Sequence, residues 1–352
     1  MERSRFKMRN KIVTLAGDGI GPEIMEAGLA VLEKVAAHIG FKYEIMPCKF
    51  GGDAIDAYGT PLPEETLEAA LHADAILHGS IGHPKFDHEA IRPEQGLLAL
   101  RKALGLFANI RPLKVYDALK ANSPVKNVEA VDFVVVRELT GGIYFGEHQL
   151  SEHEATDHCT YTRQEIERVA RVAFELARTR RKKVTSIDKQ NVLATSKLWR
   201  SVVTEVGKDY PDVTLVHQLV DSAAMLLITN PREFDVILTE NLFGDILTDE
   251  AAAIAGTLGV MASSSIGDTS ALYEPIHGSA PDIAGMGIAN PIGMIMSIAM
   301  MLASSFGEKE AALKIEQAVQ KTLEAGIVTR DLGGTATTAE IGEAIIARLS
   351  WK

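Results

Sequence analysis

Two aspartates four residues apart are the most informative pair of side chains in this chain of 352 residues. Asp245 and Asp249 stand where a helical pattern begins, in the segment that opens with Asn241. Residues at this spacing share one helix face, so both carboxylates point the same way. Two hard oxygen donors side by side suit Mg²⁺ or Mn²⁺. A second interpretation stays open, in which Asp245 favours the positive helix start and Asp249 is simply solvated.

Three arginines could hold an anionic ligand. Arg111 and Arg137 stand beside chain breakers at the ends of apolar runs, and strand ends are where α/β proteins hold their ligands. The guanidinium fork fits a carboxylate with two parallel hydrogen bonds, so Arg101, Arg111 and Arg137 together could bind a dicarboxylate. Taken singly, each arginine is equally compatible with a surface salt bridge.

A helix beginning near Pro93 would give Arg101 a distinctive neighbourhood. Its spacing places Glu94, Leu97, Leu98 and Arg101 on one face. One interpretation is a ligand face that combines a carboxylate, two aliphatic groups and a guanidinium. The alternative is a core-facing pair of leucines flanked by charged ends that reach to water.

The turn Gly17-Asp18-Gly19-Ile20-Gly21 follows a strand-like run and opens a helix, which is the context of a dinucleotide-binding turn. The third glycine of that fingerprint should stand at position 22, which is Pro22. Proline suits the first turn of a helix but not close helix–strand packing. The standard fingerprint is therefore rejected. Either the turn directs free amides at a ligand, or it is an ordinary strand-to-helix connection.

The segment from Glu274 to Asn290 is too rich in glycine and proline for regular structure, and it predicts a long ordered ligand-binding loop. Lys189 and Asp221 each follow a strand-like run, and both could be ordinary loop charges. The segment Tyr144–Thr162 loses all periodicity and could be an extended arm, a hairpin or a loop.

Strand-like and helical runs alternate along the chain, which predicts an α/β protein. The apolar stretch Pro291–Ala303 is too short to span a bilayer and predicts a buried helix. The expected strands are Lys11–Ala16, Tyr43–Pro47, Ala75–His78, Phe133–Arg137, Lys183–Asp188, Thr214–Gln218 and Val236–Thr239, and the expected helices include Glu23–Ile39, Glu64–Ala73, Arg163–Arg180 and Glu308–Ala325.

Composition narrows the class of protein. A chain that is 46% hydrophobic and 24% charged can bury a substantial core, and its length suggests two domains. The formal net charge of −11 argues against sequence-independent binding to nucleic acid or to an anionic membrane. Cys48 and Cys159 form no C-x-x-C pair, which fits a reducing cytoplasm. The basic segment Met1–Asn10 is interpreted as a short extension, not a signal peptide.

Three of these segments together resemble the β-decarboxylating dehydrogenases, the family of isopropylmalate, isocitrate, homoisocitrate and D-malate dehydrogenases. They are Arg137–Gly146, Asn241–Asp249 and His277–Gly285, and the similarity to the isopropylmalate enzymes runs from Lys11 to the C-terminus. The resemblance implies a two-domain fold that is not a standard Rossmann fold. Its large cofactor-side domain would comprise residues 1–106 and 256–352, and its small domain, with the dimer interface and the arm, residues 107–255.

The resemblance also implies roles for individual residues in a homodimer whose active sites are shared between subunits. Asp245 and Asp249, with Asp221 from the other subunit, would hold Mg²⁺ or Mn²⁺. Lys189, also from the neighbour, and Tyr144 would transfer protons, and Asp221 is counted with them as catalytic. The substrate residues would be Glu94, Leu97, Leu98, Arg101, Arg111, Arg137 and Val192; NAD would contact Ile20, Glu274, His277, Gly278, Ser279, Ala280, Pro281, Asp282, Ile283 and Asn290.

The expected reaction is NAD-dependent oxidation of the C2 hydroxyl of 3-isopropylmalate, followed by β-decarboxylation to 2-oxo-isocaproate in leucine biosynthesis. The face with Leu97 and Leu98 favours isopropyl over methyl, because burying two further carbons is worth roughly 1.6 kcal/mol. Glu94 would repel a third substrate carboxylate, and Asp282 would repel a ribose 2′-phosphate. Two alternatives remain: a D-malate or 3-methylmalate dehydrogenase, and a non-catalytic dicarboxylate-binding protein.

Overall fold

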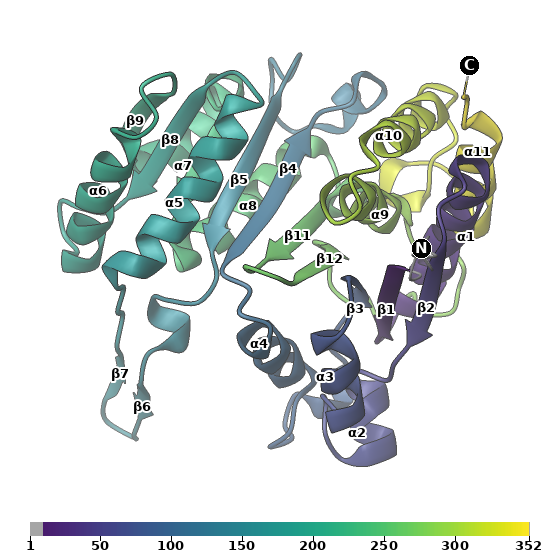
Figure 1. Ribbon diagram of the computed structural model, residues 1–352, viewed down its shortest axis with the longest axis horizontal. Coiled ribbons are helices and arrows are strands. Elements are labelled where there is room, and N and C mark those ends of the chain that lie inside the picture. Colours follow the sequence, from purple (N-terminus) through teal and green to yellow (C-terminus); the bar gives the residue numbers. More distant parts are fainter. Residues whose placement is uncertain (1–9, 352) are drawn as a thin grey trace, which may run out of the picture. The chain divides into compact units, whose positions relative to one another are not determined.

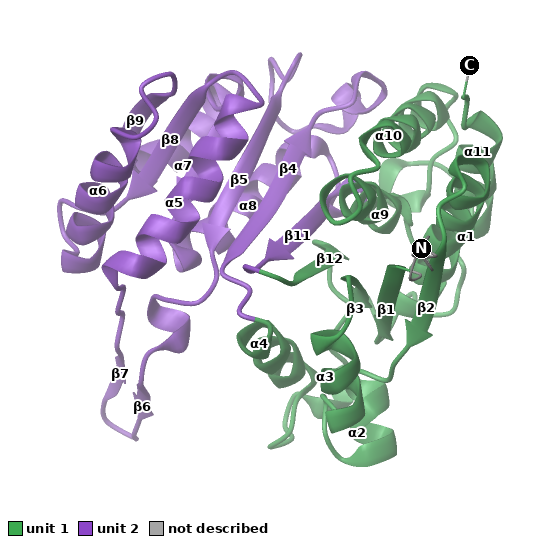
Figure 2. Cartoon of the chain, viewed as in Figure 1, with its two compact units in different colours: residues 1–104, 269–352 green, residues 105–268 purple. Residues whose placement is uncertain are grey.

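The computed structural model describes residues 10–351, so the basic segment before Asn10 lies outside the described residues. The chain forms two compact units, coloured separately in Figure 2. Unit 1 combines residues up to 104 with residues from 269 onward, so it contains both chain ends. Unit 2 is the continuous segment 105–268. Both units consist of a sheet covered by helices, which confirms the α/β class.

The second unit boundary differs from the one expected near Gly256. Residues after Gly256 continue into strand β11 (Ala262–Ile266), which pairs antiparallel with β4 (Ala108–Lys114). These backbone hydrogen bonds tie β11 to the sheet of unit 2, so the boundary falls after Asp268. The first boundary, after Leu104, is close to the expected Leu106. The cofactor and dimer roles assigned to the two domains stay predictions.

Unit 1 is a parallel sheet with the strand order β2-β1-β3-β12, and β3 is buried along its whole length. Helices α1 and α9 pack on this sheet, and α10 and α11 pack against them (Figure 1). The elements are β1 (Asn10–Gly17), α1 (Gly21–Ile39), β2 (Tyr43–Pro47), α2 (Gly52–Tyr58), α3 (Glu64–Leu71), β3 (Ala75–Ser80), α4 (Pro93–Ala103), β12 (Ala271–Pro275), α9 (Ile292–Ser304), α10 (Lys309–Glu324) and α11 (Thr338–Arg348).

Two helices show how local sequence sets the elements of unit 1. Helix α1 begins at Gly21 with proline in its first turn and ends where Gly40 adopts φ 70°, a conformation that glycine adopts without strain. Helix α9 buries Met294, Ile295 and Ile298, which confirms the buried helix predicted for this apolar stretch. Among residues 10–351, no helix combines the length and the apolar character that crossing a bilayer requires.

Unit 2 is a mixed sheet with the strand order β11-β4-β5-β10-β8-β9. Strands β11, β4 and β5 are antiparallel to one another, whereas β5, β10, β8 and β9 run parallel. In Figure 1, α5 and α6 lie in front of this sheet and α7 and α8 behind it. The bounds are β5 (Asp132–Glu138), α5 (Arg163–Arg178), β8 (Lys183–Asp188), α6 (Ala194–Gly207), β9 (Thr214–Leu219), α7 (Val220–Thr229), β10 (Val236–Thr239) and α8 (Asn241–Ala255).

The core of unit 2 lies between its sheet and the helices α5 and α6. Trp199 and Phe174 are completely buried there, with the aliphatic side chains of β8 and β10. Because β5, β8 and β10 are parallel, the segments that follow them leave the sheet at the same edge. Those segments carry Tyr144, Lys189 and the start of α8.

The irregular segment Tyr144–Thr162 is a hairpin, one of the three structures expected for it. Strands β6 (His148–Leu150) and β7 (Ala155–Asp157) pair antiparallel and form a separate two-stranded sheet. Leu150 is 88% exposed in unit 2. A two-stranded ribbon has no core of its own, which explains why its sequence lacks periodicity.

Candidate active site

One face of α8 carries the polar groups that meet the arginines of β4 and β5. Asn241 Oδ1 accepts hydrogen bonds from Arg137 Nε at 3.1 Å and Nη2 at 2.8 Å, and Asp245 pairs with Arg137 Nη1. Arg137 is 6% exposed at its side chain, whereas Asp245 is 41% exposed. The guanidinium is therefore held from one side of α8, with a buried neutral partner and a more exposed charged one.

Tyr144 completes this cluster. Its hydroxyl donates a hydrogen bond of 2.8 Å to Asp245 Oδ2, and the Arg137 guanidinium lies 5.8 Å from its ring centre. Partial burial, the hydrogen bond to Asp245 and the charge of that carboxylate raise the pKa of Tyr144. The phenol is therefore protonated at neutral pH and holds its proton more tightly than an unperturbed tyrosine.

Arg111 lies on β4 and is held by neutral groups. Asn109 Oδ1 accepts a hydrogen bond of 2.6 Å from Arg111 Nε, and Thr248 Oγ1 of α8 accepts one from Nη1. Asn109 in turn donates to Ser265 Oγ on β11 at 3.0 Å. Asn109 also stands directly opposite Arg137 in the β4–β5 register. The antiparallel pairing thus brings both arginines to one face of α8.

A buried carboxylate shapes the turn that follows Arg137. Glu138 accepts hydrogen bonds of 2.8 Å from the backbone amides of Thr140 and Gly141. A Cβ at Gly141 would lie 2.7 Å from the Tyr161 ring, so only glycine fits there. The Tyr161 hydroxyl accepts the backbone N–H of Asn241 at 2.8 Å. This packing fixes the chain between Arg137 and Tyr144 against the start of α8.

The donor set on α8 fits a hard divalent cation. Asp245 and Asp249 are separated by one helical turn, and Asp249 is exposed. Carboxylate oxygens are the ligands that Mg²⁺ and Mn²⁺ prefer. Within the described part of this single chain, no group of three or more His, Cys, Asp or Glu side chains is arranged to hold a metal ion. Asp221 is not brought to this pair within the chain.

Lys189 and Asp221 instead pair with each other. Lys189 follows β8 and Asp221 begins α7, and their side chains meet at 2.6 Å. The hydrogen bond from Lys189 lowers the pKa of Asp221. Val192 lies in the same turn as Lys189 and is 65% exposed. Unit 2 therefore presents two separate groups, one around Arg137 and one around Lys189.

Glu240 links the segments that follow β10 and β8. Its carboxyl is buried and accepts a hydrogen bond from Ser196 in the first turn of α6, the helix that follows the Lys189 turn. Glu240 itself immediately precedes Asn241 and α8. Burial raises the pKa of Glu240 to about 7, against the opposing effect of the Ser196 hydrogen bond. The sequence analysis assigned no role to this residue.

Helix α4 presents the predicted ligand face in unit 1. Its buried positions are Pro93, Gly96 and Leu100, whereas Leu98 is 47% exposed. The alternative of a core-facing pair of leucines is therefore wrong. Glu94 is exposed and approaches Gly82, where a Cβ would lie 2.9 Å from its Oε1.

Arg101, on the same helix, is held by a buried carboxylate. Its Nη2 lies 2.7 Å from Glu274 Oε1, and His78 Nδ1 lies 2.7 Å from Glu274 Oε2. Burial alone would raise the pKa of Glu274, but the charge of Arg101 and the His78 contact lower it to about 2. Both oxygens of Glu274 are thus engaged within the protein. Arg101 Nε is buried without a partner among the described residues.

The turn at residues 17–21 has no role as a set of free amides. The backbone N–H groups of Asp18, Ile20 and Gly21 donate to Ser80 O, Ser279 O and Asp18 O respectively. The Asp18 side chain accepts backbone amides from Gly52 and Gly82 at 2.8 and 2.9 Å. For these three amides the ligand interpretation is therefore wrong, and the turn instead brings Ile20 against the loop that follows β12.

The predicted cofactor loop is ordered by its own contacts. Ala280 adopts φ 40°, which is strained for a residue with a side chain. His277 Nε2 is buried without a partner among residues 10–351, and burial lowers the pKa of His277. Asn290 donates to Asp331 Oδ2 at 3.1 Å and accepts the amide of Ile292 at 3.0 Å. Gly278, Pro281 and Asp282 are exposed, and Ile283 is half-buried.

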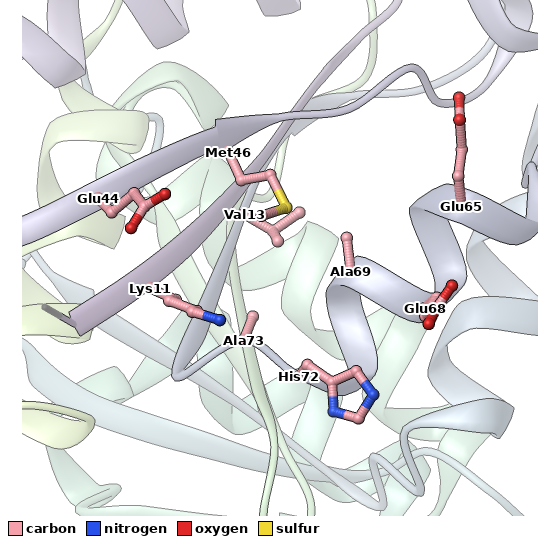
Figure 3. A pocket seen from close by; sticks show the side chains of 9 residues that line it. All are labelled: Lys11, Val13, Glu44, Met46, Glu65, Glu68, Ala69, His72 and Ala73. Atoms are coloured by element: carbon pink, nitrogen blue, oxygen red, sulfur yellow. The ribbon is translucent and has the colours of Figure 1, made fainter. Parts of the chain in front are cut away.

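A cavity of about 290 Å³ in unit 1 contains none of the predicted site residues. Strands β1 and β2 and helix α3 form it, and Figure 3 shows its side chains. Its lining consists of Lys11, Val13, Glu44, Met46, Glu65, Glu68, Ala69, His72 and Ala73. The cavity is therefore separate from the residues discussed above.

Several structural partners were missed by sequence reasoning. Asn109 stands two residues before Arg111, and Asn241 stands four residues before Asp245. This spacing was a signal that could have identified both asparagines. Thr248 lies between Asp245 and Asp249 in the sequence, and this position was a similar signal. His78, Glu240 and Asp331 gave no signal, because their partners are remote in sequence.

Comparison with known proteins gives the chain its family. The sequence model of isocitrate/isopropylmalate dehydrogenases matches residues 11–345. The chain belongs to this family. It is 65% identical to the 3-isopropylmalate dehydrogenase of Lactococcus lactis subsp. lactis over 341 residues, which is 96% of this chain and 99% of that protein.

Solved structures agree with this family membership. The chain is 39% identical to the isocitrate dehydrogenase of Methylococcus capsulatus, with a TM-score of 0.87 over 97% of this chain and 99% of the other. The β-decarboxylating dehydrogenase of Thermococcus kodakarensis is also 39% identical, with a TM-score of 0.83 over 96% of both chains. The chain is accordingly a decarboxylating dehydrogenase, and the non-catalytic alternative is wrong.

The buried Glu240 predicts a pH-dependent stability. Between the ordinary glutamate pKa and about 7, the folded state holds the proton more tightly than the unfolded state, so the free energy of unfolding falls as pH rises. Glu240→Gln stays neutral and should escape this loss. Relative to the parent, it should gain up to about 3 kcal/mol between about pH 5 and about pH 8 in urea unfolding.

The matched control for this measurement is Glu129→Gln in the same unit, where the glutamate is exposed. Its free energy of unfolding should follow that of the parent at every pH. A Glu240→Gln variant whose difference from the parent does not change with pH would show that Glu240 ionises normally.

Proposed function

We propose that this enzyme is a 3-isopropylmalate dehydrogenase: it oxidises the C2 hydroxyl of its substrate with NAD and a divalent metal, and then decarboxylates the product to 2-oxo-isocaproate in leucine biosynthesis. The observation that carries the proposal is the 65% identity, over nearly the full length of both chains, to a relative of that name. The contacts of the site residues support it in detail.

The three arginines are the proposed binding groups for the malate carboxylates. In unit 2, Arg111 is oriented by hydrogen bonds to Asn109 and Thr248. In unit 1, Arg101 lies on α4 and its Nη2 is held 2.7 Å from Glu274 Oε1. A guanidinium fork oriented in advance binds a carboxylate without losing much side-chain entropy.

Asp245 and Asp249, with Asp221 of the partner subunit, are the proposed metal ligands. When bound, Mg²⁺ or Mn²⁺ withdraws electrons from the C2 oxygen and stabilises the negative charge that develops as CO₂ leaves. Lys189 of the partner subunit takes the hydroxyl proton. Tyr144, whose raised pKa keeps the phenol protonated, then gives a proton to the carbon that has lost CO₂.

The exposed side of α4 is the proposed specificity surface. Leu98 and the half-buried Leu97 offer apolar area to a 3-alkyl group, and Val192 is named with them in the family. Covering two extra carbons is worth roughly 1.6 kcal/mol, which corresponds to about a tenfold preference over methyl. The Glu94 carboxylate near these leucines disfavours a third carboxylate on the substrate.

The α4 surface should make the enzyme prefer 3-isopropylmalate to D-malate. The value of kcat/KM for 3-isopropylmalate should exceed that for D-malate by about tenfold or more, and Leu97→Ala with Leu98→Ala should narrow the ratio. Leu313→Ala, at an exposed leucine of α10, is the matched control and should leave the ratio unchanged. Equal values for both acids in the parent would instead favour the D-malate or 3-methylmalate alternative.

The cofactor should be NAD and not NADP. Asp282 is exposed in the loop after β12, where its carboxylate can accept a hydrogen bond from a ribose 2′-hydroxyl but would repel a 2′-phosphate. Ile20 reaches the same loop through its hydrogen bond to Ser279 O. Separate assays with NAD alone and with NADP alone test this choice, because the reduced cofactors have the same absorbance; kcat/KM should be higher for NAD.

The metal proposal predicts loss of turnover on chelation. Exhaustive dialysis against EDTA should abolish NADH formation, and added Mn²⁺ should restore it. Asp249→Asn should lower kcat by on the order of 100-fold or more. The neighbouring Glu250→Gln is the matched control, because Glu250 lies on α8 but outside the proposed ligand set. Full activity of the dialysed enzyme would refute the metal role.

A dimer with shared sites is part of the proposal. Met225 and Ile228 on α7 and Ile246 on α8 are 59%, 45% and 60% exposed, and these two helices pack on each other. Large apolar side chains gathered on one helix pair are typical of a protein–protein interface. The Lys189–Asp221 pair also supports sharing, because one subunit can supply both groups together.

Mixed dimers provide the test of sharing. Lys189→Ala and Asp249→Ala should each be inactive alone. Unfolding and refolding them together should restore about a quarter of the parent activity, because half of the dimers are mixed and each mixed dimer has one intact site. Mixing Lys189→Ala with Asp221→Ala should restore no activity, because each site takes both of these residues from the same partner subunit. Sites made within one chain would leave both mixtures inactive.

A further inference from the structure

His78 is a buried polar side chain that the proposed reaction does not use. It lies on β3, is 2% exposed, and follows the fully buried Ile76 and Leu77. Its strand pairs in parallel with β12, with Leu77 beside Tyr273. The next side chain on β12 is Glu274, and His78 Nδ1 lies 2.7 Å from Glu274 Oε2.

The contact divides the two oxygens of Glu274 between two partners. Oε1 receives Arg101 Nη2 at 2.7 Å, and Oε2 receives His78. The charge of Arg101 and the His78 contact lower the pKa of Glu274 to about 2 despite its burial, so the carboxylate is ionised. An ionised carboxylate only accepts hydrogen bonds, so His78 Nδ1 must be the donor.

Without that donor, the pairing with Arg101 would change. An arginine and a carboxylate prefer two parallel hydrogen bonds. Leaving the buried Glu274 Oε2 without a hydrogen bond would cost free energy. Rotation of the Glu274 carboxylate toward Arg101 would give Oε2 a partner and remove that cost. The guanidinium would then direct a second nitrogen at Glu274 and would no longer have that nitrogen available for a ligand.

We propose that His78 is a positioning residue: by occupying Glu274 Oε2, it keeps the Glu274–Arg101 pair to a single hydrogen bond and leaves the remaining Arg101 donors for the substrate carboxylate. The proposal rests on the proposed role of Arg101 in binding the malate group. The buried, unpartnered Nε of Arg101 is consistent with a guanidinium held in this way.

The surroundings of His78 fix its ring. Phe50 is 1% exposed and meets the ring edge-on, with centres 5.3 Å apart and planes at 89°. His78 Nε2 is buried and has no partner in the described part of the chain. The ring therefore has one polar contact to make, and that contact is with Glu274.

A pair of variants of similar size tests the proposal. His78→Leu removes the donor, whereas the amide nitrogen of His78→Asn can stand near the position of Nδ1 and donate in its place. His78→Leu should raise KM for 3-isopropylmalate roughly tenfold, with kcat changed less than about twofold. His78→Asn should restore KM to within about twofold of the parent.

Two further outcomes separate positioning from mere support of the fold. In a Glu274→Gln background, His78→Leu should have no additional effect on KM, because the contact is already altered. If His78→Leu and His78→Asn raise the KM for 3-isopropylmalate equally, the positioning role is overturned. It is also overturned if both variants lower kcat to the same extent.

Failure of the proposed substrate can be told apart from failure of this inference. The parent is first assayed with a panel of 2-hydroxy dicarboxylic acids. If it prefers an acid other than 3-isopropylmalate, the proposed substrate is wrong. The comparison of His78→Leu with His78→Asn is then made on the preferred acid, and it still decides the role of His78, because these acids share the malate carboxylates.

Discussion

The structure depends on holding arginines in largely water-free surroundings through hydrogen bonds to specific acceptors. A buried guanidinium needs hydrogen-bond acceptors, and the acceptors chosen decide what the group can still bind. Arg111 donates hydrogen bonds to Asn109 and Thr248. Arg137 meets Asn241 deep inside and Asp245 toward solvent. The acceptors on α8 therefore set both geometry and electrostatics.

In unit 1, the acceptor of the arginine is a carboxylate. Glu274 compensates Arg101 directly, and His78 limits how closely the two can pair. The Asp18 carboxylate binds backbone groups in the same unit, because it accepts hydrogen bonds from the amides of Gly52 and Gly82. Buried charges in this unit thus serve mainly to fix neighbouring segments, and the groups proposed to meet ligands lie on the exposed side of α4 and in the loop after β12.

Predictions from sequence were most accurate where the signal was periodic and local. Strands β2, β8 and β10 begin and end at the expected residues, because their apolar runs are bounded by breakers. The expected boundary near Gly256 differs from the end of unit 2 after Asp268, because the membership of β11 depends on its pairing with β4, far away in sequence. The sequence left two interpretations of the glycine turn open for a related reason, because its hydrogen-bond acceptors, Ser80 and Ser279, are remote.

Strands β4, β11 and β12 were not among the elements expected from the sequence. The sequence by itself determined the α/β class, the Asp245–Asp249 spacing on one helix face and the family. Each depends on residue type and short-range periodicity. Only the tertiary structure decided which acceptor each arginine meets, that Leu98 is exposed instead of buried, and that His78 and Glu240 belong beside the site residues. These contacts join segments far apart in the chain, and packing, which is cooperative, selects them.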